Sequence, residues 1–340
     1  MSELDWLIYR GVGEPHDGVA ERLPPPPPWR DFAAPLPDEE PETREDPGTE
    51  RRLGRFADLA GIYQADAEEV DAVNAALYLR RPLLITGPPG VGKSTLAYAV
   101  AHELKLGQVL RWPVVSTSVL KDGLYSYDAV GRLQEATLAG MRLNAAGAAD
   151  PRSIGAFLRL GPLGTALLPA RRPRVVVVDE LDKADVDLPN NLLNVLEEGT
   201  FAIPELERAA TETPVVEVLT DDGSTARIEH GRVACHAFPL VMITSNGERE
   251  FPYPLLRRCI RVELRPPDDQ RLTAMVRAHL GEDAARDAGD LIAMFVQRSR
   301  QGLLATDQLL NAIYLTQHQI GRGSRTLLAE RLMQPLDRQR

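Results

Sequence analysis

The sequence predicts an α/β protein in which a domain built on a parallel sheet is followed by a small all-α domain. Between about residues 56 and 265, short apolar runs alternate with stretches of helical periodicity, the pattern of a parallel sheet covered by helices. The run at 174–180 is almost continuously apolar, as expected for a central strand buried on both faces. Beyond residue 265, apolar residues recur only three or four positions apart, which is typical of helices.

Five apolar runs account for the strands of the predicted sheet. They lie at 82–86, 109–116, 174–180, 238–246 and 259–264. The second run contains Pro113, which cannot donate a hydrogen bond to an inner ladder, so we expect this strand at a sheet edge. A further stretch, 215–233, alternates like two strands joined at Asp222 and Gly223, a pair typical of tight hairpin turns.

Helices are predicted wherever apolar residues follow helical spacing. These stretches are 66–79 and 95–107 in the first domain, and 269–281, 288–300, 303–319 and 325–336 after the sheet. The change of pattern places a nucleotide-binding domain at 56–265 and a helical lid at 266–340.

The first 55 residues differ in composition from the rest of the chain. Five consecutive prolines at 24–28 favour an extended left-handed helix, and the acidic, proline-broken stretch 35–50 is typical of a linker. We therefore expect 1–55 to be a partly disordered arm. Its apolar start could dock on the main body or on a partner, or the arm could be loosely packed.

Composition excludes several classes of protein. The formal net charge of −10 disfavours a general affinity for nucleic acid, which usually accompanies a basic surplus. The two cysteines lack CxxC spacing, which argues against a disulfide framework or a structural zinc site. No signal-peptide pattern and no apolar run of about 20 residues is present, so we predict a cytoplasmic protein without a membrane segment.

A phosphate-binding loop of the form GxxxxGKS follows the first strand and precedes a helix. Its residues are Gly87, Pro88, Pro89, Gly90, Val91, Gly92, Lys93, Ser94 and, one position further, Thr95. Glycines let backbone amides approach phosphate oxygens, and the helix N-terminus favours an anion. Lys93 would add positive charge at the β- and γ-phosphates, and the Ser94 hydroxyl is placed to bind Mg²⁺.

Polar residues also end two further predicted strands, one after the other along the chain. Asp179 and Glu180 close the apolar run 174–180, where Asp179 can hold the Mg²⁺ shell and Glu180 can orient and deprotonate a water. Asn246 closes the next strand and can hold that water or the γ-phosphate, or it can simply start a turn. The acidic residues that follow, including Asp182, are interpreted as a solvated helix start.

In this order, the phosphate loop, the acidic strand end, Asn246 and a following YPLLRRC segment resemble an AAA+ ATPase. The segments 159–168, 187–199 and 215–233 resemble the MoxR branch of that family. The resemblance implies a three-layer P-loop domain with a helical lid, ATP and Mg²⁺ as cofactors, and a homo-oligomeric ring, usually of six subunits. It also implies chaperone-like remodelling of a protein substrate, often with a von Willebrand factor A-type partner.

The resemblance further implies that an arginine reaches the neighbouring subunit's γ-phosphate. Arg258 matches this arginine finger and Arg257 is the adjacent alternative. The lid departs from the family pattern, because its sensor-2 position offers Thr306 and Asp307 instead of arginine, with Arg298 and Arg300 as the candidate substitutes.

A loop at 120–133 follows the edge strand, where related rings present loops to a central pore. Tyr125 and Tyr127 could grip a polypeptide there, or simply pack within the loop. Two other functions stay open at this stage: a nucleic-acid-handling motor, and a slow nucleotide-gated switch or scaffold in signalling or defence.

Overall fold

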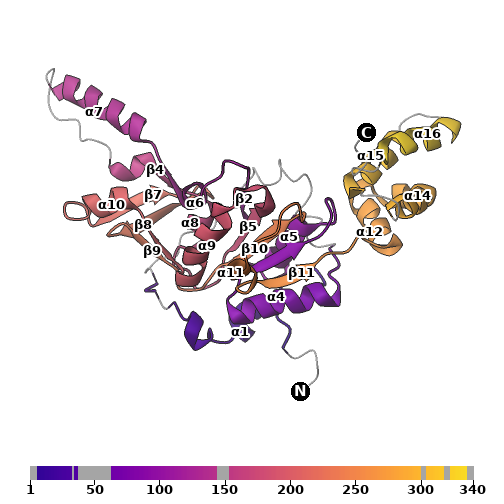
Figure 1. Cartoon of the computed structure of the whole chain (residues 1–340), viewed down its shortest axis with the longest axis horizontal. Coiled ribbons are helices and arrows are strands. Elements are labelled where there is room, and N and C mark those ends of the chain that lie inside the picture. The colour runs from indigo at the N-terminus through magenta and orange to yellow at the C-terminus, as the bar shows by residue number, and fades with distance from the viewer. Residues whose placement is uncertain are drawn as a thin grey trace.

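The structure is a computed structural model of the chain, and it describes residues 6–32, 34–36, 63–143, 153–299, 304–317 and 322–334. Figure 1 shows a central sheet with its helices, a second sheet beside a projecting helix α7 (Ala129–Leu143), and a separate cluster of C-terminal helices. Most of the predicted linker 35–50 lies outside the described residues.

The central sheet is parallel, and the described strands follow the order β11-β1-β10-β5-β2. The strands are β1 Leu83–Thr86, β2 Leu110–Pro113, β5 Val175–Asp179, β10 Leu240–Ser245 and β11 Ile260–Glu263. All five predicted strands are therefore confirmed. The edge position predicted from Pro113 is also confirmed, since β2 pairs with β5 alone in this sheet of the described chain.

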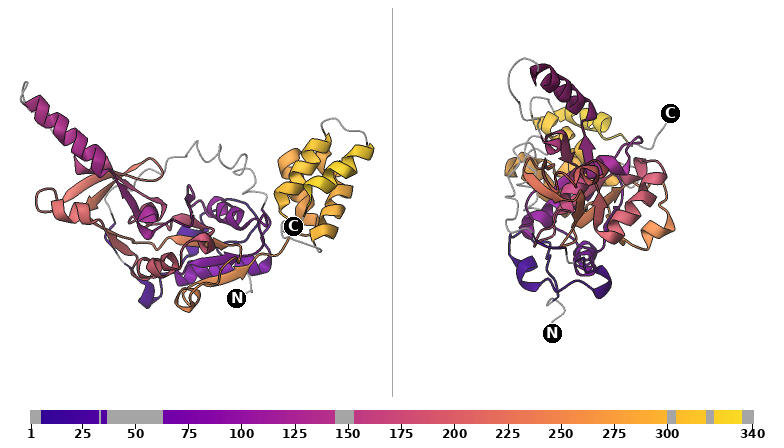
Figure 2. Two further views of the ribbon diagram at one scale, coloured as in Figure 1. Left: turned by 45° about the horizontal axis from the view of Figure 1, so that its top comes forward. Right: turned by 90° about the vertical axis from the view of Figure 1, so that its left-hand side faces the viewer.

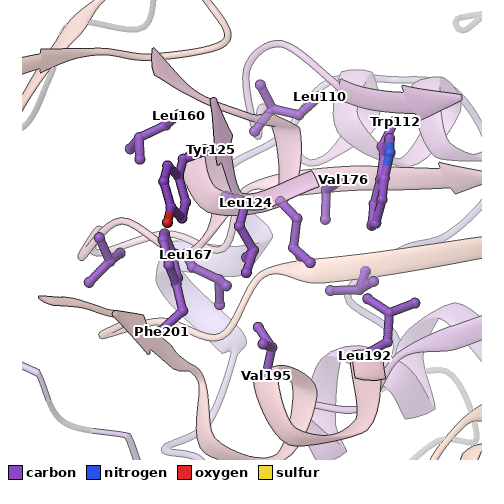
Figure 3. Close-up of a cluster of buried hydrophobic side chains, with 14 of the residues drawn as sticks. Leu110, Trp112, Leu124, Tyr125, Leu160, Leu167, Val176, Leu192, Val195 and Phe201 are labelled. Atoms are coloured by element: carbon purple, nitrogen blue, oxygen red, sulfur yellow. The ribbon is translucent and has the colours of Figure 1, made fainter. Parts of the chain in front are cut away.

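Helices cover both faces of this sheet, as the apolar strand β5 requires. Val175 and Val177 pack on one side with α4 (Ala67–Leu79) and α5 (Lys93–Glu103). On the other side, Val176 and Val178 pack with α8 (Pro162–Ala166) and α9 (Asp187–Glu198). Figure 3 shows this second core around Val176, with Leu192 and Val195 of α9 approaching from below the strands. The chain thus forms the predicted three-layer α/β fold.

A second sheet lies beyond the edge of the first and was predicted only in part. The described strands follow the order β3-β4-β7-β8-β9-β6. They are β3 Tyr125–Tyr127, β4 Leu158–Leu160, β6 Thr200–Ala202, β7 Val215–Leu219, β8 Thr225–Glu229 and β9 Arg232–Ala234. The hairpin β7–β8 is the one expected around Asp222 and Gly223. The other strands have three residues each, too few for an alternating pattern to reveal them.

Short helical elements lie in the connections of both sheets. They are α6 Leu120–Leu124, η2 Ile154–Phe157, η3 Leu181–Lys183, α10 Pro204–Ala209 and α11 Tyr253–Leu256.

The C-terminal helices form a separate cluster (Figure 2). The cluster has an apolar core of its own. The helices are α12 Asp269–Leu280, α13 Glu282–Asp287, α14 Gly289–Ser299, α15 Thr306–Gln317 and α16 Arg322–Leu332. The core is made of buried apolar side chains such as Leu272, Phe295, Leu309 and Met333. None of the described helices combines the length and the apolar character that crossing a membrane requires.

Residues 6–32 pack against the central domain. Of the alternatives stated for the start of the arm, the structure therefore shows docking on the main body. This segment contains α1 (Gly18–Arg22) and η1 (Pro28–Arg30). Ile8 and Tyr9 are fully buried beside α4 and α5, and their backbone amides donate to the side chain of Asn74. This part of the predicted arm is therefore packed on the central domain.

Candidate active site

The phosphate loop joins β1 to α5 in a conformation that depends on glycine. Gly87, Gly90 and Gly92 have φ angles of 143°, 77° and 98°, values that side chains of L-residues rarely allow. A Cβ on Gly90 would also lie 2.7 Å from the backbone nitrogen of Thr306 in the lid. Gly92 is the N-cap of α5, and among the described residues no side chain caps the first-turn amides. These amides are therefore available to an anionic ligand.

Lys93 lies inside this loop. Its ammonium group donates to the carbonyl oxygens of Gly87 at 2.8 Å and Pro88 at 2.9 Å, and to Oδ1 of Asn246 at 2.7 Å. Burial lowers the pKa of Lys93, and the charges of nearby acidic groups, Asp182 foremost, only partly oppose this. The loop and the end of β10 thus hold the lysine at the place where the motif predicts phosphate binding.

Asp179 at the end of β5 is fully hydrogen-bonded. Its Oδ1 accepts from Ser94 Oγ at 2.9 Å and from Thr244 Oγ1 at 2.7 Å, and its Oδ2 accepts from Nε and Nη2 of Arg111 at 3.0 and 2.5 Å. Burial alone would raise the pKa of Asp179. The hydrogen bonds and the charge of Arg111 outweigh burial and hold that pKa below its ordinary value. Asp179 is therefore an ionised carboxylate next to the Ser94 hydroxyl.

Glu180 is the next residue and has an unusual backbone. Its φ of 60° places it in the left-handed region, where a non-glycine residue is uncommon and strained. The backbone amide donates to Thr244 Oγ1 at 2.8 Å. Both carboxylate oxygens are also engaged: Oε1 accepts from Asn246 Nδ2 at 3.3 Å and Oε2 from Lys183 Nζ at 2.7 Å. The side chain stays partly exposed and lines the same cavity as the phosphate loop.

Asn246 links the other groups of the site. Its amide oxygen accepts from Lys93 while its amide nitrogen donates to Glu180. Its backbone amide, together with that of Glu248, donates to Oδ2 of Asp182. Asp182 is only 3% exposed, so the prediction that it belongs to a solvated helix start was wrong. It holds the turn that carries Asn246.

These residues surround one cavity of about 690 Å³ between the central domain and the lid. The central domain contributes most of the phosphate loop, including Thr95, together with Tyr63, Arg111, Asp179, Glu180 and Asn246. The lid contributes Arg271, Met275, His279, Thr306 and Asp307 among others. Thr306 Oγ1 donates to the carbonyl oxygen of Gly90 at 2.6 Å and so ties the start of α15 to the loop.

The donor set fits a nucleotide with Mg²⁺. The volume is within the range of small-molecule and cofactor sites. Uncapped amides and Lys93 suit phosphate oxygens, and the neighbouring oxygens of Ser94 and Asp179 are the hard ligands that Mg²⁺ prefers.

The arginines expected at the γ-phosphate lie outside this cavity. Arg258 donates to Glu197 at 2.6 Å and to the carbonyl oxygen of Pro254, and it does not line the cavity of its own chain. Arg298 donates to the carbonyl oxygens of Glu330 and Met333 within the lid, and Arg300 lies outside the described residues. The expected substitution of sensor 2 by Arg298 is therefore not present in this structure.

The two tyrosines of the loop after β2 are engaged within the protein. Tyr125 is buried and its hydroxyl donates to Glu205 at 2.9 Å, while the hydroxyl of Tyr127 accepts from Arg132. Packing within the loop, the second of the two alternatives, is what the structure shows for Tyr125.

The roles of four residues at the site were not predicted from the sequence: Arg111, Thr244, Asp182 and Arg271. Arg111 lies in the apolar run 109–116 and is the one charged residue there. That charge was the available signal for a role at the site. Thr244 lies two residues before Asn246, near the end of the predicted strand 238–246, and that position was the available signal. Nothing in the sequence indicated that Arg271 of the lid reaches Glu69 of α4 at 3.1 Å.

A phosphate loop at the end of a central parallel strand, with an acidic strand end beside it and a helical lid over it, defines a P-loop ATPase fold of the AAA+ type. The family model "AAA domain (dynein-related subfamily)" matches residues 82–258, just over half of the chain, and the protein belongs to this family.

The other comparisons are more distant. The structure of C. elegans PCH-2 shares 14% sequence identity with this chain, covering 85% of this chain and 69% of that one at a TM-score of 0.38. This similarity is too low to indicate what the present chain does. No curated protein was found to match the sequence.

Proposed function

We propose that the protein is an Mg²⁺-dependent ATPase. One observation carries the proposal: Lys93, Ser94, Asp179, Glu180 and Asn246 come from three separate segments and are linked by hydrogen bonds around one cavity. Membership of the AAA family supports ATP as the nucleotide.

The residues divide the work by their chemistry. The loop amides and Lys93 bind the phosphates, and Ser94 and Asp179 hold Mg²⁺, which when bound would neutralise charge on the phosphate oxygens. Glu180 orients the attacking water and accepts its proton. Asn246 positions Glu180 through the hydrogen bond from Nδ2.

Two substitutions separate binding from hydrolysis. Lys93→Ala is expected to abolish binding of a fluorescent ATP analogue, whereas Glu180→Gln is expected to bind it normally and to hydrolyse ATP at least about a hundredfold more slowly. Lys105→Ala is the matched control for Lys93→Ala, because Lys105 forms only a surface ion pair with Asp17. Normal ATP binding by folded Lys93→Ala would contradict the proposed site.

We further propose a homo-oligomeric ring, with six subunits as the expected size and Arg258 acting on the neighbouring subunit's nucleotide. The position of Arg258 outside its own cavity supports action in trans. Arg258→Ala should bind ATP normally and hydrolyse it poorly, and mixing it with Glu180→Gln should restore activity, because some interfaces then combine an intact arginine with an intact glutamate. If Arg257→Ala shows this behaviour instead, Arg257 is the finger.

The ring itself has a separate test. Glu180→Gln at high ATP and protein concentration should elute from gel filtration as a hexamer. An exclusively monomeric elution under these conditions would contradict the ring.

The same proposal includes a MoxR-like role in remodelling or maturing a protein, with a von Willebrand factor A-type protein as the expected partner. The hairpin β7–β8 before β10 supports this branch of the family, because the resemblance places a hairpin there. A pull-down with Glu180→Gln in the presence of ATP should retain the partner, and Lys93→Ala should not. Equal recovery with both variants would speak against nucleotide-dependent capture.

We also propose that the chain divides into an arm at 1–55, a nucleotide-binding domain at 56–265 and a lid at 266–340. The separate apolar core of the C-terminal helices supports the last boundary. Two buried free cysteines, Cys235 and Cys259, suit a reducing cytoplasm. Limited proteolysis should cut first within the predicted linker 35–50 and near 266.

A slow nucleotide-gated switch is the second candidate, and one observation favours it. Glu180 accepts hydrogen bonds at both carboxylate oxygens, from Asn246 and from Lys183. These bonds restrain the carboxylate and make it less available to accept a proton from water. Under this alternative, Lys183→Ala should raise kcat by releasing Glu180. An unchanged or lower kcat would remove the support for a switch.

A further inference from the structure

Arg111 occupies an unusual place at the candidate metal site. It lies in the edge strand β2, and its guanidinium donates through Nε and Nη2 to one carboxylate oxygen of Asp179. Its side chain is 42% exposed and lines the cavity. Sequence reasoning assigned it no role, and the proposed hydrolysis does not use it.

The carboxylate of Asp179 has no acceptor capacity left. A carboxylate offers about four lone-pair sites. Two of them are taken by Ser94 and Thr244 on Oδ1, and two by Arg111 on Oδ2. A cation that binds Asp179, directly or through water, must therefore displace one of these donors.

Arg111 is the donor best able to leave. Thr244 is 1% exposed and is also fixed by the backbone amide of Glu180. Ser94 is held by helix α5 and is itself a proposed metal ligand. Of these three donors, Arg111 is the one whose side chain is exposed. After leaving Asp179, its guanidinium would remain in the cavity.

Of the three Lys and Arg side chains that line the cavity among the described residues, Arg111 is the one whose present partner a metal ion would compete for. Lys93 already donates to two loop carbonyls, and the lid arginine Arg271 is held by Glu69, which is 1% exposed. A guanidinium near the phosphate loop matches phosphate oxygens well, because its donors suit bidentate contacts.

We propose that Arg111 is a positioning residue that exchanges between Asp179 and the nucleotide phosphates, and so competes with Mg²⁺ for Asp179. The inference rests on the proposed nucleotide site. Its consequence is a stronger coupling between Mg²⁺ and nucleotide, because a metal ion at Asp179 releases Arg111 to the phosphates, and phosphates that hold Arg111 leave Asp179 open to the metal ion.

The test measures equilibrium binding and not turnover. Binding of a fluorescent ATP analogue is titrated in EDTA and in saturating Mg²⁺, and Mg²⁺ is titrated at fixed analogue. For Arg111→Met, binding in saturating Mg²⁺ should weaken about tenfold, the loss expected for a charge-assisted hydrogen bond. Binding in EDTA should weaken less, because Arg111 must there give up Asp179 to reach the phosphates, so the factor by which Mg²⁺ strengthens binding should fall.

Two further variants keep the result interpretable. Arg111→Lys retains the charge but not the two-donor fork, so its binding in saturating Mg²⁺ should stay closer to that of the wild type, and it carries the test if Arg111→Met does not fold. Arg232→Met is the matched control, since Arg232 forms an exposed ion pair with Glu207 on the second sheet. It should leave both titrations unchanged.

The outcomes separate this inference from the proposed function. If wild type binds the analogue and Lys93→Ala does not, but Arg111→Met shows the wild-type dependence on Mg²⁺, only the role of Arg111 is overturned. If the wild type binds in neither condition, the proposed nucleotide site fails as well.

Discussion

A buried carboxylate anchors residues 10–13 of the N-terminal segment, and Glu103→Gln tests that anchor. Glu103 is the last residue of α5 and is fully buried. Its Oε1 accepts from the backbone amides of Arg10 at 2.6 Å and Gly11 at 3.3 Å. Its Oε2 accepts from those of Val12 and Gly13, both at 2.8 Å. Four successive amides thus converge on one side chain, an anion-binding nest.

The size of the effect follows from this geometry. Glutamine keeps one carbonyl oxygen, so two of the four bonds can persist, but its NH₂ group would face the other two amides. A hydrogen bond to a charged group is worth about 1.5 kcal/mol at the low end, so losing two costs about 3 kcal/mol. This corresponds to about a hundredfold rise in the population with the segment detached.

Limited trypsin digestion measures that population, because Arg10 and Arg22 are exposed within the segment. When opening is fast relative to cleavage, the cleavage rate follows the open fraction, so Glu103→Gln should be cut about a hundredfold faster at these sites. Glu21→Gln, an exposed change on α1, should behave like the wild type. Wild-type cleavage of folded Glu103→Gln would refute the anchoring role of Glu103.

Three other substitutions test the packing of the fold. Asp222→Asn should lower the free energy of unfolding by about 3 kcal/mol, because it leaves Arg174 buried without its partner at 2.7 Å. Burial alone would raise the pKa of Asp222. Hydrogen bonding and the charge of Arg174 outweigh burial and lower that pKa below its ordinary value of 3.8. In urea titrations the difference from the wild type should therefore be complete above about pH 4 and shrink as the pH falls through the lowered pKa. Glu69→Gln should weaken the contact with Arg271 and speed hydrogen exchange in α12 by about tenfold, and unchanged exchange would argue against a lid tether. Gly164→Ala should reduce the melting temperature sharply, since its Cβ would lie 1.9 Å from a backbone carbonyl oxygen of α6, and a wild-type melting curve would contradict this packing.

Local patterns were enough to predict the elements that carry the site. The GxxxxGKS stretch predicts its own backbone, because glycines at 87, 90 and 92 adopt conformations closed to other residues. The apolar runs before Asp179 and Asn246 predict parallel strands, and the carboxyl ends of such strands meet at one edge of the sheet. The encounter of Lys93 with Asn246 follows from that topology.

Contacts between distant segments could not be predicted in the same way. Arg111 and Asp179 are 68 positions apart, and their pairing depends on the register in which β2 aligns with β5. Asp182 belongs to an acidic stretch that resembles a solvated helix start, and only the approach of the turn after β10 makes it a buried acceptor. Short strands such as β3 and β6 take their form from their neighbours.

The sequence by itself therefore determined the class of fold, the five strands of the central sheet, and the phosphate loop, because periodicity and backbone preference are local properties. Only the tertiary structure decided which charges meet: Arg111 with Asp179, Lys183 with Glu180, and the N-terminal amides with Glu103. The physical reason is that a hydrogen bond or ion pair depends on a few ångströms of distance, which sheet register and packing set after the chain has folded.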